Sequence, residues 1–109
     1  MAYDEALAQR VRAALNDAPG LSEKKMFGGI GFLLHGNMAC GVNGTNLIVR
    51  INPEHSEEAV TQPFVRPFDM TGRPMKGWIL VDSEGVQSED DLKDWIEQGV
   101  IFAQSLPSK

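Results

Sequence analysis

The chain of 109 residues has one cysteine and no long hydrophobic run, and each of these absences excludes a class of protein. The lone cysteine, Cys40, cannot form an intramolecular disulfide, and a single thiol cannot supply a cysteine-rich zinc site. No apolar stretch approaches the roughly 18 residues that a membrane-spanning helix needs. The N-terminal residues are acidic and lack the basic and apolar regions of a secretory signal. The sequence therefore predicts a protein of the reducing cytoplasm.

An excess of basic residues is also absent. Lysine and arginine number 10 against 15 aspartate and glutamate residues, which gives a net charge of −5 and a pI of about 4.9. A general binder of nucleic acid or of anionic membranes needs a positive field, so this balance excludes both classes. The hydrophobic fraction of 42% and the charged fraction of 23% are ordinary for globular proteins. Residues 1–109 are therefore predicted to form a single domain.

Residues 3–18 have the hydrophobic spacing of a helix. Their apolar side chains recur at intervals of three and four residues, which places them on one helical face. These positions are Tyr3, Leu7, Val11, Ala14, Leu15 and Ala18. Pro19 and Gly20 end the pattern, because proline cannot continue a helix and glycine tolerates left-handed backbone angles. The segment predicts an amphipathic helix that packs on another element.

Between residues 23 and 51 the hydrophobic pattern alternates with the period of strands. Three strands are predicted, at about residues 30–34, 38–42 and 46–51. Gly36-Asn37 and Asn43-Gly44 separate them as two-residue hairpin turns, of type II′ and type I′ respectively. The residues expected to share a face within a strand are Ile30, Phe32 and Leu34, then Met38, Cys40 and Val42, then Leu47, Val49 and Ile51. The pattern predicts an antiparallel meander.

The next segment contains a short helix, a loop and a strand. Pro53 opens a helix that is predicted to run to about Gln62. Three prolines make residues 63–74 a loop, with a short extended piece at Phe64-Val65. Residues 75–81 are predicted to form a strand.

A capped helix is predicted at the end of the chain. Ser88 is followed by three acidic residues, a pattern typical of a helix N-terminus, and the helix runs to about Ser105. Ile101 and Phe102 lie outside its narrow apolar stripe, so the helix is expected to pack on two sides or to contribute to a dimer interface. The whole order of elements predicts one α+β domain, with helices packed on an antiparallel sheet.

No catalytic or metal-binding constellation stands out among these elements. His35 beside a turn and His55 at a helix start are typical of solvated surface residues, and Cys40 alternates with apolar neighbours as a buried residue does. The glycine-rich residues 28–31 lack the spacing of a phosphate loop and precede a strand, so a bend or bulge is expected there. The acidic cluster at 89–94 lacks the ligand spacing of a calcium loop. The sequence predicts no catalytic residue, metal or cofactor.

Basic residues are concentrated in one part of the chain. Residues 24–76 hold six basic and four acidic residues, whereas residues 82–109 hold two basic and seven acidic ones. Arg73 lies between a glycine and a proline, so a stiff loop could present it to an anion or to a partner's carboxylate. Arg73, Lys76 and Arg50 are therefore the predicted binding residues, with an ordinary solvated or ion-paired arginine as the alternative for Arg73.

Several motifs carry a family resemblance: KMFGGIGF at 25–32, GNMA at 36–39, NLIVR at 46–50, GRPMKGW at 72–78, and the helix with Leu92 and Trp95. Together they resemble the N-terminal domain of TfoX/Sxy proteins, over roughly residues 11–103. The resemblance implies a two-layer fold of order α-β(3)-α-β(2)-α, similar to type III secretion chaperones. It also implies a role in natural competence, in which these proteins assist a cyclic-AMP-dependent transcription activator. Those regulators have a second, C-terminal domain, and this chain is expected to be a stand-alone N-terminal domain.

Two functions from different classes are consistent with these observations. The first is a non-enzymatic regulatory module that acts through protein contacts, with a protein partner that could belong to the transcription machinery, and with a homodimer as a possible assembly. The second is a domain that binds a small anionic ligand, or an enzyme, with a pocket near Arg73. Strong direct binding of nucleic acid or of membranes is not expected, because of the net negative charge.

Overall fold

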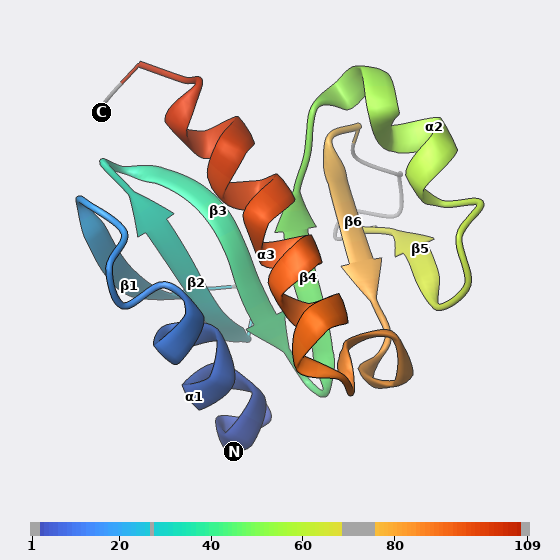
Figure 1. Cartoon of the computed structure of the whole chain (residues 1–109), viewed down its shortest axis with the longest axis horizontal. Helices are drawn as coiled ribbons and strands as arrows, with labels where there is room; N and C mark the ends of the chain where they lie inside the picture. The colour runs from blue at the N-terminus through green and yellow to red at the C-terminus, as the bar shows by residue number, and fades with distance from the viewer. Residues whose placement is uncertain (1–2, 27, 69–75, 108–109) are drawn as a thin grey trace.

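The computed structural model describes residues 3–26, 28–68 and 76–107. Within this part of the chain, six strands form one antiparallel sheet in the order β1-β2-β3-β4-β6-β5 (Figure 1). The strands are β1 (Leu21–Met26), β2 (Gly29–Leu34), β3 (Asn37–Asn43), β4 (Asn46–Arg50), β5 (Val65–Pro67) and β6 (Trp78–Val81). The helices are α1 (Glu5–Ala14), α2 (Ser56–Ala59) and α3 (Glu89–Gln104), with short 3₁₀ helices η1 (Pro53–His55) and η2 (Ser83–Val86).

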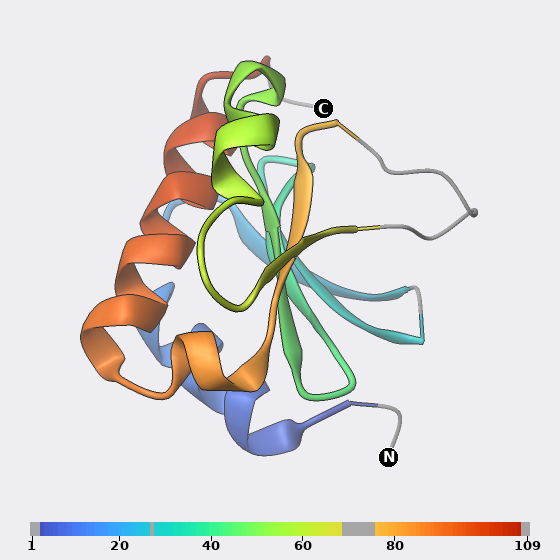
Figure 2. The same cartoon turned by 90° about the vertical axis from the view of Figure 1, so that its right-hand side faces the viewer.

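The helices lie on one face of the sheet, so the fold has two layers (Figure 2). α3 packs against β3 and β4 in the middle of the sheet, and α1 lies beside α3. This arrangement confirms the predicted α+β class, in which helices pack on an antiparallel sheet. In the described ranges, no helix is both long and apolar enough to cross a membrane.

The first group of strands has one more member than the three that were predicted. β1 pairs with β2 along its whole length, from Leu21 opposite Leu34 to Met26 opposite Gly29. Residues 22–25 of β1 are polar and exposed. The hydrophobic alternation that identifies a strand requires one buried face, and this edge strand lacks one. Because residues 22–25 are polar, hydrophobic alternation does not identify β1 in the sequence.

The first hairpin turn lies one residue earlier than predicted. Leu34 pairs with Asn37, so the central residues are His35 and Gly36. Both have a positive φ, 51° and 86°, which a type I′ turn requires and a type II′ turn does not. Asn37 begins β3 instead, and its buried side-chain amide donates a hydrogen bond of 2.8 Å to the carbonyl of Pro107.

The second hairpin turn lies one residue later than predicted. Asn43 pairs with Asn46, so Gly44 and Thr45 are the central residues. Of these two residues only Gly44 has a positive φ, 58°, as in a type II′ turn. The two hairpins are where the sequence predicts them, but their turn types are exchanged, because the asparagine of each turn joins the strand ladder.

A β-bulge in β3 corrects the predicted face of Met38. Phe32 pairs with Cys40, but Leu33 pairs with Met38, so Ala39 is an extra residue in β3. The extra residue interrupts the alternation of side chains along the strand. Met38 therefore packs in a small cluster on the sheet face away from the helices, whereas Cys40 lies in the main core under them.

The helices are shorter than predicted at three of their ends, while the start of α3 is as predicted. α1 begins after Asp4, whose carboxylate accepts hydrogen bonds from two backbone N–H groups of the first turn. The segment after Pro53 forms η1 and α2, which end at Ala59 rather than at Gln62. Ser88 caps α3 by accepting a 3.1 Å hydrogen bond from the N–H of Asp91.

The last two strands also differ slightly from their predicted ranges. β5 begins at Val65, so the predicted extended piece at Phe64-Val65 lies one residue early. β6 begins at Trp78, and the predicted start of this strand at residue 75 lies outside the described residues.

Gly99 allows α3 to approach the sheet closely. A Cβ atom built on Gly99 would overlap the carbonyl oxygen of Ala39 in β3 and would lie 3.4 Å from Cγ1 of Val49 in β4. Gly99 is itself buried in the middle of α3. The helix and the sheet can therefore pack at this distance only because the side chain is absent.

We expect Gly99→Ala to lower the free energy of unfolding by about 1–3 kcal/mol, because the added methyl group overpacks the contact with Ala39. Helix propensity alone predicts the opposite, a gain of roughly 1 kcal/mol for alanine over glycine. Urea denaturation followed by circular dichroism measures the sign. The control Gln104→Ala, at an exposed position of α3, should stay within about 0.5 kcal/mol of the wild type. A more stable Gly99→Ala protein would contradict the packing argument.

Candidate functional site

The three predicted binding residues differ in whether the structure describes them and in their contacts. Arg73 lies outside the described residues. Lys76 is exposed and precedes β6 by two residues. Arg50 is the last residue of β4, where it pairs with Trp78 of β6 and is partly exposed. Lys76 and Arg50 therefore belong to the same end of neighbouring strands, and only Arg50 has a defined set of contacts.

The guanidinium of Arg50 lies over two aromatic rings. Its Cζ atom is 5.2 Å from the ring centroid of Trp78 and 5.4 Å from that of Phe102 in α3. Both distances are within the range of cation–π attraction, which is worth roughly 0.5–1 kcal/mol at an exposed site. Because the rings come from β6 and α3, Arg50 also joins the sheet to the helical layer at this end.

The other arginines of the described chain are bound to carboxylates. Arg10 contacts Glu89 at 2.9 Å, and Arg66 contacts Asp82 at 2.9 Å. Arg12 makes a two-pronged contact with Glu23, at 2.6 and 2.7 Å. That hydrogen bonding lowers the pKa of Glu23 and raises the pKa of Arg12.

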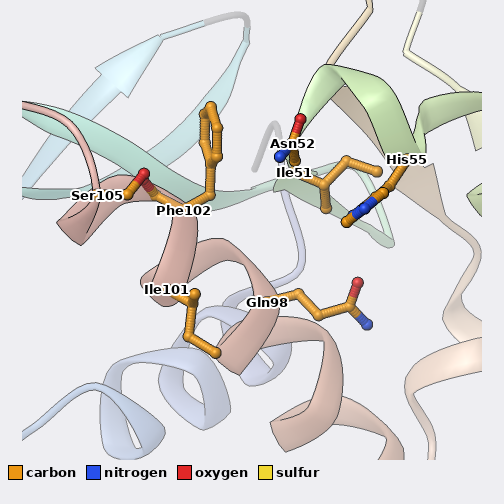
Figure 3. A pocket seen from close by; sticks show the side chains of 7 residues that line it. All are labelled: Ile51, Asn52, His55, Gln98, Ile101, Phe102 and Ser105. Carbon is orange, nitrogen blue, oxygen red and sulfur yellow. The ribbon is translucent and has the colours of Figure 1, made fainter.

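A cleft of about 280 Å³ lies between the segment after β4 and the last turns of α3. Figure 3 shows its two walls, one from the chain around η1 and the other from α3. The lining residues are Ile51, Asn52, His55, Gln98, Ile101, Phe102 and Ser105. A second hollow of about 230 Å³ shares His55 and Gln98 with it and extends toward Gln62 beside α2. Together they form a groove between α3 and the η1–α2 segment.

The cleft combines an apolar interior with a polar rim. Ile101 is 60% exposed, although most large apolar side chains of the described residues are buried. Phe102 is partly buried and belongs both to the cleft and to the contact with Arg50. The sequence predicted that these two residues pack on a second side of the helix or contribute to a dimer interface. The first cleft has no acidic residue in its lining, so it differs from the chain as a whole.

The hydroxyls of Ser105, in the cleft lining, and of Ser56, next to His55, form hydrogen bonds with the backbone. The hydroxyl of Ser105 donates a 2.6 Å hydrogen bond to the carbonyl of Phe102, and the hydroxyl of Ser56 accepts one of 2.6 Å from the N–H of Gly77. Among the residues that the structure describes, no group of three or more His, Cys, Asp or Glu side chains could hold a metal ion.

The buried thiol of Cys40 lies in the main core and is inaccessible. Desolvation by burial raises its pKa to about 12, so the thiol stays protonated at neutral pH. The glycine-rich residues 28–31 were expected to form a bend or bulge: Gly28 lies in a turn with a φ of 72°, and residues 29–31 belong to β2. A Cβ atom at Gly29 would overlap the carbonyl oxygen of Val42 in the neighbouring strand β3.

The family match covers most of the domain described above. The model of the TfoX N-terminal domain matches residues 13–103, from the end of α1 to the last turn of α3. The chain belongs to the TfoX N-terminal domain family. This family is not a known enzyme family. Comparison with curated protein sequences gave no match.

The contacts of Trp78, His55 and Gln98 were not found by analysis of the sequence of this TfoX N-terminal domain. Each of these residues lies beside residues that are far from it in the sequence. Trp78 contacts Arg50, and His55 and Gln98 line the same cleft. The sequence did contain an indication of the contact between Arg50 and Trp78. The motif NLIVR ends in Arg50 and the motif GW contains Trp78, and an arginine and a tryptophan that are paired on neighbouring antiparallel strands can stack on each other.

We expect Cys40 to react with iodoacetamide at pH 8 on the order of a thousandfold more slowly than an exposed thiol, because the thiolate fraction falls tenfold for each unit by which the pKa is raised. Thr45→Cys, at an exposed turn position, supplies the exposed thiol in the same chain. Mass spectrometry of timed samples measures both rates, and denaturation in urea should equalise them. Equal rates in the native protein would contradict the burial of Cys40.

Proposed function

We propose that this TfoX N-terminal domain is a non-catalytic module that binds a protein partner along the groove between α3 and the η1–α2 segment. The observation that carries this proposal is the exposure of Ile101 beside the cleft. An exposed apolar side chain next to a concave, partly apolar surface is typical of interaction sites.

The shape of the groove supports a protein partner. The cleft of about 280 Å³ accommodates one or two side chains of a partner. The groove continues past His55 toward Gln62, so an extended or helical segment could lie between α3 and the η1–α2 segment.

The resemblance to TfoX/Sxy proteins, which are regulators of competence, supports the proposal of a regulatory role. The family match covers residues 13–103, and this chain has a net charge of −5. Because a negative net charge disfavours direct DNA binding, a role in transcription would operate through contacts with a protein. The regulatory process itself is part of this proposal.

We expect Ile101→Glu to reduce capture of the partner from native lysate at least about tenfold, since burial of a charge at an interface centre costs more than 1.4 kcal/mol. The matched control is Gln9→Glu, which adds the same charge at an exposed position of α1. Quantitative mass spectrometry of proteins retained by the tagged wild type and both variants is the measurement.

Two outcomes would contradict the proposal. In the first, the two variants retain the same proteins in the same amounts as the wild type. In the second, light scattering shows that the wild type is a dimer and that Ile101→Glu alone is a monomer, which would mean that a second copy covers the groove.

A further inference from the structure

We infer that Arg50 is a receptor for a carboxylate, and that the adjoining cleft takes an apolar group attached to that carboxylate. The ligand would thus be an acidic and hydrophobic segment of the partner, a conclusion that rests on the proposed function. The carboxylate site itself rests on the contacts of Arg50 alone.

The first argument is that the guanidinium of Arg50 forms no ion pair within the described residues. A guanidinium has five N–H donors. Arg10, Arg12 and Arg66 use theirs on carboxylates, but within the described residues the guanidinium of Arg50 has ring contacts and no acceptor oxygen. Among the acidic residues in the described ranges, none forms an ion pair with Arg50.

The second argument is that the rings orient the guanidinium. When a guanidinium stacks on a ring with its face, its edge, where the N–H donors lie, stays free for a carboxylate. Trp78 and Phe102 restrict the side chain of Arg50 before any ligand binds. A pre-oriented donor loses less conformational entropy on binding, which favours recognition.

The third argument is the chemistry next to Arg50. Phe102 both contacts the guanidinium and lines the cleft, and Ile51 follows Arg50 directly and lines the same cleft. A carboxylate held by Arg50 would therefore have an apolar surface beside it. The cleft lining contains no acidic residue that would repel it.

A carboxylate fits this site better than a phosphate does. One guanidinium matches the single charge and the two oxygens of a carboxylate through two parallel hydrogen bonds. The cleft lining adds amides, a hydroxyl and one imidazole, but no lysine or arginine that would offset a second negative charge. The net charge of −5 further disfavours a dianion.

The probes for the experiment are sodium hexanoate, hexanamide and inorganic phosphate, each titrated into the purified full chain. Two-dimensional NMR follows the Nε–H group of Arg50 and the indole N–H of Trp78. We expect saturable shifts of both signals with hexanoate, at least tenfold weaker binding of hexanamide, and no saturable effect of phosphate at the same ionic strength. The hexanoate affinity should also fall as sodium chloride is added.

Variants distinguish binding at Arg50 from nonspecific attraction of an anion to positive charge. Arg50→Gln should remove hexanoate binding, whereas Lys24→Gln, an equal loss of charge at an exposed position of β1, should leave it within about threefold. The NMR spectrum of each variant reports whether it is folded, and Arg50→Lys, which keeps the charge but loses the planar fork, should bind at least several-fold more weakly. Binding that survives in Arg50→Gln, equal binding of hexanamide, or tighter binding of phosphate would each overturn the inference.

A comparison of hexanoate with a peptide tests whether the carboxylate belongs to a free acid or to a protein segment. We expect acetyl-Ser-Leu-Glu-Leu-Ser-amide to bind more tightly than hexanoate and than its glutamine analogue, and to lose this advantage in Ile101→Gln. If hexanoate binds and the peptide does not, a free acid rather than a protein segment is the ligand, and the segment is ruled out. Hexanoate binding without capture of a partner that depends on Ile101 would overturn the proposed function and leave the carboxylate site intact.

Discussion

The close contact between α3 and the sheet determines where the other parts of this domain lie. Gly99 brings the helix against Ala39, at the bulge of β3. Because the helix is held at its middle, its last turns are directed toward the end of β4, where Phe102 meets Arg50. The cleft, the exposed Ile101 and the ring contacts of Arg50 all depend on this placement.

The sequence predicted the fold class, both hairpins and the long C-terminal helix, because each has a strong local cause. Ser88 identifies the start of α3 through its hydroxyl, and alternating apolar residues identify strands with a buried face. The missed features have non-local causes. β1 is defined by its pairing with β2, and the bulge at Ala39 is defined by the register of two strands rather than by residue type.

The same distinction applies to the site. Arg50 was predicted as a binding residue from the distribution of charge, whereas Ile101 and Phe102 were predicted from their helical positions only to pack on a second side of the helix or at a dimer interface. Ile101 and His55 line the same cleft because of the path that the chain takes after β4 relative to α3. The spacing of residues along the sequence does not predict that path. Arg73, the residue that the sequence favoured most, lies outside the described residues.

The polar edge strand β1 has a consequence for assembly. A sheet can grow by pairing its outermost strand with another chain, and lysines on such a strand oppose that growth. β1 carries Lys24 and Lys25 on an exposed edge, and the opposite edge is β5, only three residues long and ending in Pro67. Both borders therefore oppose the pairing of this sheet with the edge strand of another one.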